Sequence, residues 1–154
     1  MYVLEIDGNN PQRIDGVKEC KNWIANRLNE VSIKYAEKFG IELTAPTTRK
    51  NDGSTYKDKN HALTTSQIRN VFGEVKRLQM KGFNYDEFLL LKPRFAYAAQ
   101  RKGTQGSEDF HKVMGAAMDA VIETNDSNEQ QKRFINFCNL FESILAYHRA
   151  HGGR

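Results

Sequence analysis

The chain of 154 residues is 39% hydrophobic and 27% charged, which is typical of one soluble domain, since domains usually contain about 100 to 200 residues. Its purely apolar runs, such as residues 88–91, are far shorter than the roughly 20 residues that span a membrane. The first residues also lack the basic and apolar regions of a secretory signal. We therefore predict no membrane span and expect a cytoplasmic protein.

The net charge of +4 is distributed unevenly along the chain. Residues 49–102 contain 12 basic and 5 acidic side chains, a net charge of +7, whereas the rest of the chain has a net charge of −3. A local positive field attracts phosphates and fades over about one Debye length, roughly 8 Å at physiological salt. The central segment is therefore the first place to look for a phosphate-bearing partner.

Apolar residues recur at steps of three and four, which is the period of α-helices and favours an all-α fold. The first helix is predicted over residues 15–40, with Asp15 as its N-cap and Gly40 as its end. Residues 1–14 are predicted to be a loose N-terminal segment, because termini are often poorly packed. The apolar stripe of this helix, expected to face the core, consists of Val17, Cys20, Ile24, Leu28, Val31 and Tyr35.

The helical pattern disappears over residues 41–62, which contain Pro46, Gly53 and several polar residues interleaved with lysines. This composition predicts a long, basic, mobile loop after the first helix. Loops longer than about 15 residues are uncommon in compact domains and are often functional. Lys50 is the cation of this loop that we include among the candidate binding residues.

Four further helical regions follow, so the whole pattern predicts one domain over residues 1–154, a compact bundle of about five helices. Residues 64–82 begin with capping residues, and residues 85–102 contain Pro93, which marks either a kink or a new helix start. Ser107 is predicted to cap the fourth helix, and residues 127–130 form a capping-box pattern for the fifth. The third and fifth helices are expected to be the most central.

The aromatic residues of these helices are interpreted as structural. Phe134, Phe137 and Phe141 repeat at helical spacing, which favours core packing over a surface for stacking nucleobases. Tyr97 and Tyr147 lie among apolar residues and are likewise expected to serve the structure.

Catalysis requires titratable side chains that converge, and the sequence has few candidates. His148 and His151 lie three residues apart without further ligands at suitable spacing, so we interpret them as a cationic helix C-terminus rather than a metal site. Motifs for nucleophilic, phosphate-binding or zinc-protease sites are missing. Cys20 and Cys138 fall within apolar patterns and are predicted to be buried thiols. We expect neither catalysis nor a metal or cofactor.

Basic side chains define the candidate binding surface. Arg69 and Lys76 are seven residues apart and are expected to share the exposed helix face, with Gly73 between them leaving room for a phosphate backbone. The next helical region, residues 85–102, also carries basic side chains and few acidic ones. The basic residues of the two regions are expected to line a groove that contacts phosphates without reading sequence. The candidates are Arg69, Lys76, Arg77, Lys92, Arg94, Arg101, Lys102 and Lys50.

Three motifs resemble a known family in their order and spacing. They are LTTSQIR at residues 63–69, LKPRFAYAAQR at residues 91–101 and FESILAYHR at residues 141–149. The chain resembles the small subunit of type III-A CRISPR effector complexes, the Csm small subunit, over about residues 63–153. Arg69 lies inside the first motif and Lys92, Arg94 and Arg101 lie inside the second, so these four are the strongest candidates for contact with an RNA backbone.

The resemblance implies a small helical protein without catalytic activity of its own. Several copies would stack head to tail beside the backbone subunits, along the duplex of guide RNA (crRNA) and target RNA. Target cleavage would belong to the backbone subunits, and polymerase-like and DNase activities to the large subunit. Contact with phosphates suits such a system, because base pairing with the guide reads the sequence.

Two other interpretations are open at this stage. The first is the equivalent small subunit of the type III-B (Cmr) complex, which is also helical and basic. The second is a helical adaptor whose basic face is only a solvated surface and whose function lies in protein contacts. Salt dependence separates the adaptor from an RNA-binding protein, since only phosphate contacts weaken steeply as salt rises.

Overall fold

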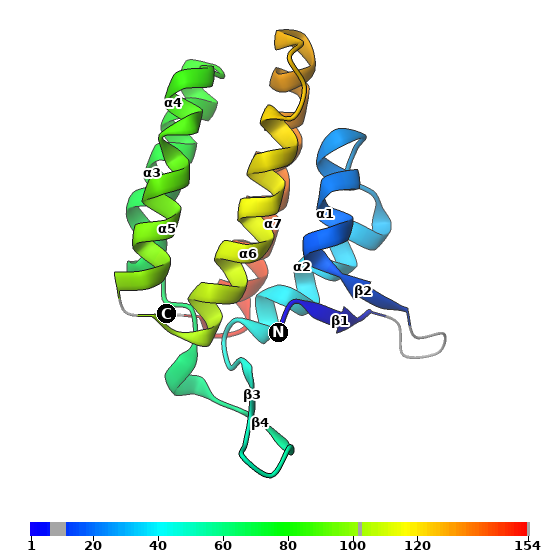
Figure 1. The fold of residues 1–154 in the computed structure, drawn as a ribbon, viewed down its shortest axis with the longest axis vertical. Coiled ribbons are helices and arrows are strands. Elements are labelled where there is room, and N and C mark those ends of the chain that lie inside the picture. Colours follow the sequence, from blue (N-terminus) through cyan, green and yellow to red (C-terminus); the bar gives the residue numbers. More distant parts are fainter. Residues whose placement is uncertain (7–11, 102, 154) are drawn as a thin grey trace.

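Helices dominate the computed structural model, which describes residues 1–6, 12–101 and 103–153, so the prediction of an all-α bundle is confirmed. The described residues form more helices than the five predicted, and two small antiparallel hairpins accompany them (Figure 1). None of the described helices is long and apolar enough to cross a membrane. The helices are α1 (Gly16–Ala25), α2 (Glu30–Glu42), α3 (Thr65–Lys81), α4 (Tyr85–Leu89), α5 (Leu91–Arg101), α6 (Gln105–Ile122) and α7 (Ser127–Ala150); the strands are β1 (Val3–Glu5), β2 (Arg13–Asp15), β3 (Thr47–Arg49) and β4 (Thr55–Lys57).

The centre of the bundle is formed by α6 and α7. Figure 1 shows them between α3, α4 and α5 on one side and α1 and α2 on the other. Phe134, Phe137 and Phe141 of α7 are all buried, which confirms their interpretation as core residues. The expectation that the third predicted helix is central is wrong, because only one face of α5 is buried while α6 buries side chains around most of its circumference.

The first predicted helix is in fact two helices. Asp15 is the N-cap of α1 as predicted, and its carboxylate accepts a hydrogen bond from the Val17 amide at 3.0 Å. The chain then breaks after Ala25, because Asn29 caps a new helix: its side chain accepts from the Ser32 amide, and the Ser32 hydroxyl accepts from the Asn29 amide, both at 2.9 Å. The break turns α2 back beside α1.

Gly40 does not end a helix, contrary to the prediction. It lies inside α2, where that helix crosses α7 so closely that an added Cβ would stand 2.8 Å from the His148 nitrogen and the Ile144 oxygen. Glycine is therefore present for close backbone approach rather than for a turn.

Residues 41–62 contain a hairpin where a structureless loop was expected. β3 and β4 pair with Thr48 opposite Tyr56, and Gly53 adopts a φ of 89° in the connecting turn. The hairpin projects away from the helices (Figure 1), followed by a short 3₁₀ turn at Lys59–His61. Its mobility stays a prediction. The N-terminal segment also has structure, since β1 pairs with β2 and Leu4 and Ile14 pack against the core.

The remaining helix boundaries agree closely with the sequence patterns, although the N-cap of α7 is Asp126, whose side chain accepts from the Glu129 amide, rather than a capping box of residues 127–130. α3 begins after its cap Thr64 and ends at Gly82, as predicted. Pro93 lies in the first turn of α5, where its missing N–H has no helical partner to lose, so it marks a helix start rather than a kink. α6 begins earlier than predicted, because Thr104 is the cap and Ser107 is the third helical residue of a capping box.

Candidate nucleic-acid interface

A groove of about 590 Å³ separates α3 from α5. The two helices lie side by side in Figure 1 because α4 turns the chain back after α3. Two of the predicted binding residues, Arg94 and Arg101, line this groove. Its lining residues are Ser66, Gln67, Asn70, Val71, Glu74, Pro93, Arg94, Tyr97, Ala98 and Arg101.

The helical period of α5 explains which side chains face the groove. Leu91, Phe95 and Ala99 are buried in the core, so the side chains about 180° away around the helix are exposed. Arg94 and Tyr97 lie on that exposed side. Tyr97, which the sequence suggested serves the structure, lies outside the core, since 67% of its surface is exposed. The sequence signal of this exposure was the position of Tyr97 two residues after buried Phe95, because residues two apart lie on different faces of a helix.

The predicted exposed face of α3 is present but lies away from the groove. Arg69, Gly73 and Met80 are exposed, and nothing stands within 4 Å of an added Cβ at Gly73. Arg69 forms no ion pair with any other described residue, so its charge is available to a partner. Lys76 is different, because its ammonium donates to Glu142 of α7 at 2.5 Å and lies 5.7 Å from the Phe72 ring centre.

Carboxylates also neutralise three other candidate cations. A carboxylate oxygen of Glu74 lies 2.9 Å from a guanidinium nitrogen of Arg77 and 3.1 Å from a guanidinium nitrogen of Arg94. The hydrogen bond from Arg77 and the positive charges of both arginines hold the pKa of Glu74 below its ordinary value. Arg77 reaches Glu87 as well, at 3.3 Å. Lys92 contacts Asp119 of α6 at 2.5 Å and therefore lies outside the groove. Such exposed pairs are weak, so phosphates can compete for these cations.

Lys50 lies near the tip of the β3–β4 hairpin, apart from both helix faces. Its ammonium is 5.4 Å from the centre of the Tyr56 ring, and both residues are exposed. Arg101 in the groove resembles Arg69 in having no ion pair within the described part of the chain. Lys102 lies outside the described residues. The structure thus distributes the candidates over the groove, the outer face of α3, the side of α5 against α6, and the hairpin.

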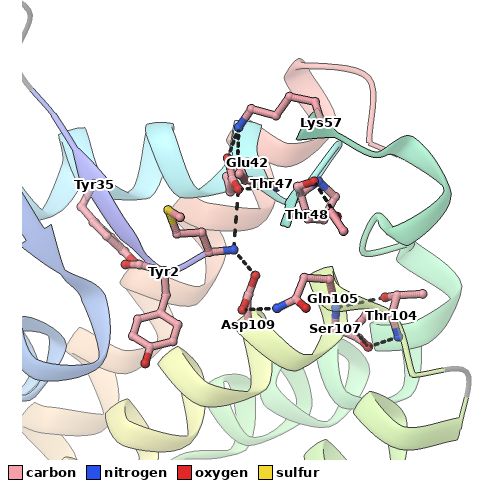
Figure 2. Close-up of polar contacts among 12 residues, drawn as sticks. Tyr2, Tyr35, Glu42, Thr47, Thr48, Lys57, Thr104, Gln105, Ser107 and Asp109 are labelled. Atoms are coloured by element: carbon pink, nitrogen blue, oxygen red, sulfur yellow. Dashed lines mark hydrogen bonds and ion pairs between the residues drawn. The ribbon is translucent and has the colours of Figure 1, made fainter. Parts of the chain in front are cut away.

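The hairpin is held to the bundle by a buried carboxylate (Figure 2). Glu42 accepts a hydrogen bond from the Thr47 amide at 2.7 Å and another from the Lys57 ammonium. Burial alone would raise the pKa of Glu42, but these two hydrogen-bond partners hold it below its ordinary value. Close by, the buried Asp109 carboxylate contacts the α-amino group of Met1 and accepts from Gln105 at 2.9 Å. Lys57 therefore anchors the hairpin, whereas Arg49 and Lys50 are exposed cations of its described residues.

His148 is fully buried, so its interpretation as part of a cationic helix end is wrong. Its Nε2 donates to the Leu63 carbonyl at 2.8 Å, and Nδ1 has no partner among the described residues. Burial lowers the pKa of His148 below its ordinary value of about 6.5, because the charged form loses its hydration. Within the described residues, no group of three His, Cys, Asp or Glu side chains is placed to hold a metal ion.

We expect the free energy of unfolding to fall as the pH drops below about 6.5. In the unfolded chain His148 binds a proton near its ordinary pKa, whereas in the folded chain its lowered pKa makes protonation less favourable. The stability that this difference provides is fully present above pH 6.5 and is lost as the pH falls through the folded pKa. Urea unfolding at pH 7.5 and pH 5.5 measures this loss. His148→Gln should reduce it and the control His151→Gln at an exposed site should not; an unchanged pH dependence in His148→Gln would contradict the assignment.

The fold and the candidate surface define a small helical protein with exposed cations on two helices and a hairpin. The chain matches the family model described as Csm2 Type III-A over residues 29–154, so it belongs to this family, that of the small subunit of the Csm complex. The resemblance found in the sequence is thereby confirmed.

One relative is the CRISPR system Cms protein Csm2 of Enterococcus italicus, which is 27% identical over 97 residues. This match covers 56% of the present chain and 66% of the relative, slightly less than two thirds of its length. No solved structure matches the chain.

Proposed function

We propose that this protein is a non-catalytic subunit of a type III-A CRISPR effector complex and holds the target RNA, paired with the guide RNA, through its phosphates. Family membership supports the setting. The observation that carries the proposal is the exposure of Arg69 and Arg101 without a carboxylate partner among the described residues, in a segment of strongly positive charge.

The cations differ in their expected contribution to RNA binding. Arg69, Arg101 and Lys50 are free of ion pairs within the described residues and need break no contact with a carboxylate to bind a phosphate. The four cations in ion pairs must first exchange a carboxylate for a phosphate, so we expect smaller effects from them. They are Lys76, Arg77, Lys92 and Arg94. Lys102 remains a candidate on its charge alone.

The proposal includes the assembly of several copies beside backbone and large subunits of the complex. A single copy is expected to bind RNA weakly, because stacking of copies along one duplex multiplies affinity through effective concentration. Recognition through phosphates alone leaves sequence reading to base pairing between guide and target.

The test compares RNA affinity over a range of salt concentrations for Arg69→Ala/Arg101→Ala and for the wild-type chain. Each lost phosphate contact should lower the slope of log K against log salt by about 0.7 to 0.9, and affinity should fall at low salt. Lys38→Ala/Lys132→Ala is the matched control, since it removes the same charge from exposed positions on α2 and α7.

Circular dichroism should show unchanged helicity in both double variants, because all four side chains are exposed. Equal losses of affinity in the two variants would show a nonspecific effect of net charge. RNA binding that is absent at low salt, or independent of salt, would favour a helical adaptor that acts through protein contacts.

A further inference from the structure

We propose that the α3–α5 groove binds one unpaired nucleobase of the RNA, stacked on the ring of Tyr97. This inference rests on the proposed function and assigns the groove a role different from phosphate contact. Tyr97 is the starting point, because 67% of its surface is exposed and its ring contacts no other aromatic ring or cation among the described residues. An aromatic face of this kind is the usual platform for an unstacked base.

The walls of the groove suit the face and the edge of a base. Pro93 and Ala98 supply apolar surface beside Tyr97, and Val71, which is almost fully buried, also borders the groove. Ser66 and Asn70 of α3 add a hydroxyl and an amide, which can donate to and accept from the polar edge of a base. Apolar walls with a few polar groups are characteristic of sites for small ring systems.

The size of the groove also fits a nucleotide. Its volume of about 590 Å³ lies within the roughly 300 to 1,000 Å³ that small-molecule sites occupy. Such a space receives a single splayed nucleotide but not a base pair within a duplex, whose flat faces are covered by its neighbours. The ligand is therefore a nucleotide that is unpaired and unstacked.

The charge of the groove favours RNA over a protein side chain. Arg94 and Arg101 line it from positions seven residues apart on α5, about 10 Å along the helix axis. Two guanidinium groups on either side of an aromatic platform are placed to contact the phosphates that flank one splayed nucleotide. Arg101 has no ion pair within the described residues, and Arg94 shares Glu74 with Arg77.

The test uses two RNAs that are identical except that one carries an abasic site at a single unpaired position. The wild-type full-length chain should bind the RNA with the base about tenfold more tightly, the effect typical of one stack of a base on an aromatic ring. Tyr97→Ala should remove this difference, whereas Tyr97→Phe should keep it. Tyr85→Ala is the matched control, because Tyr85 is an exposed tyrosine at the start of α4 outside the groove.

The salt dependence separates this inference from the proposed function. Tyr97→Ala should leave the slope of log K against log salt unchanged, because no phosphate contact is lost. Photocrosslinking of 4-thiouridine at the unpaired position should label the two walls of the groove, residues 66–74 of α3 or residues 91–101 of α5. If Tyr97→Ala still distinguishes the two RNAs, or the crosslink lies elsewhere, the groove is not a base site although phosphate binding stands. If the wild-type chain binds neither RNA at low salt, both proposals fail.

Discussion

Replacing Phe141 with alanine is expected to lower the free energy of unfolding by about 3 to 5 kcal/mol, the usual cost of truncating a buried phenylalanine. Phe141 is fully buried at the place where four helices meet. Its ring centre lies between 5.7 and 6.0 Å from the ring centres of Phe72 on α3, Phe95 on α5, Phe110 on α6 and Phe137 on α7. No single neighbour can fill the space left by the ring, so a cavity remains.

The measurement is urea unfolding followed by far-ultraviolet circular dichroism. Ile135→Ala is the matched control, because Ile135 lies on the same helix with 55% of its surface exposed and should change stability by less than about 0.5 kcal/mol. Phe141→Leu keeps much of the volume and should cost less than Phe141→Ala. If Phe141→Ala lowered the free energy of unfolding no more than Ile135→Ala, this would contradict the packing of Phe141 among four helices.

Apolar periodicity predicted the long helices well because buried side chains recur along each of them at steps of three and four. It did not predict the break between α1 and α2, because buried residues occur at helical spacing on both sides of it. Cys20 and Ile24 of the predicted stripe lie on α1, whereas Tyr35 of the same stripe lies on α2. The ring centre of Tyr35 is 5.5 Å from that of Trp23 on α1, so one stripe spans two helices that contact each other. The capping pair Asn29 and Ser32 was the local signal of the break.

The β3–β4 hairpin left no periodic signal. Each strand has three residues and the hairpin is largely exposed, so there is no buried face to impose an alternating pattern. The available signal was turn chemistry: residues 51–53 read Asn-Asp-Gly, and threonine and tyrosine, which favour strands, lie on either side. The anchor between Glu42 and Lys57 joins residues 15 apart, a pairing that sequence alone does not reveal.

The three motifs that revealed the family mostly describe packing. The first and third meet where His148 donates to the Leu63 carbonyl, and the second and third meet where Phe95 packs against Phe141. The arginines within the motifs point outward, as their charge predicted. The ion pairs of two candidate lysines were not predictable, because Glu142, the partner of Lys76, and Asp119, the partner of Lys92, lie 66 and 27 residues away in the chain.

Gly40 and Gly73 both lie inside helices, yet alanine is expected to have opposite effects at the two sites. At Gly40 an alanine Cβ would stand 2.8 Å from backbone atoms of His148 and Ile144, so α2 and α7 must move apart. Overpacking of this kind costs about 1 to 3 kcal/mol. At Gly73 the space is empty, so Gly73→Ala should stabilise the protein by about 0.5 to 1 kcal/mol through the higher helix propensity of alanine.

Urea unfolding of the two variants provides a test that needs no other control, since the chemical change is identical in both. The expected result is a lower midpoint for Gly40→Ala and a higher midpoint for Gly73→Ala than for the wild-type chain. If Gly40 instead only ended a helix, as the sequence suggested, alanine there would meet no backbone atom of α7. A stabilising Gly40→Ala would therefore show that the two helices do not touch at this glycine.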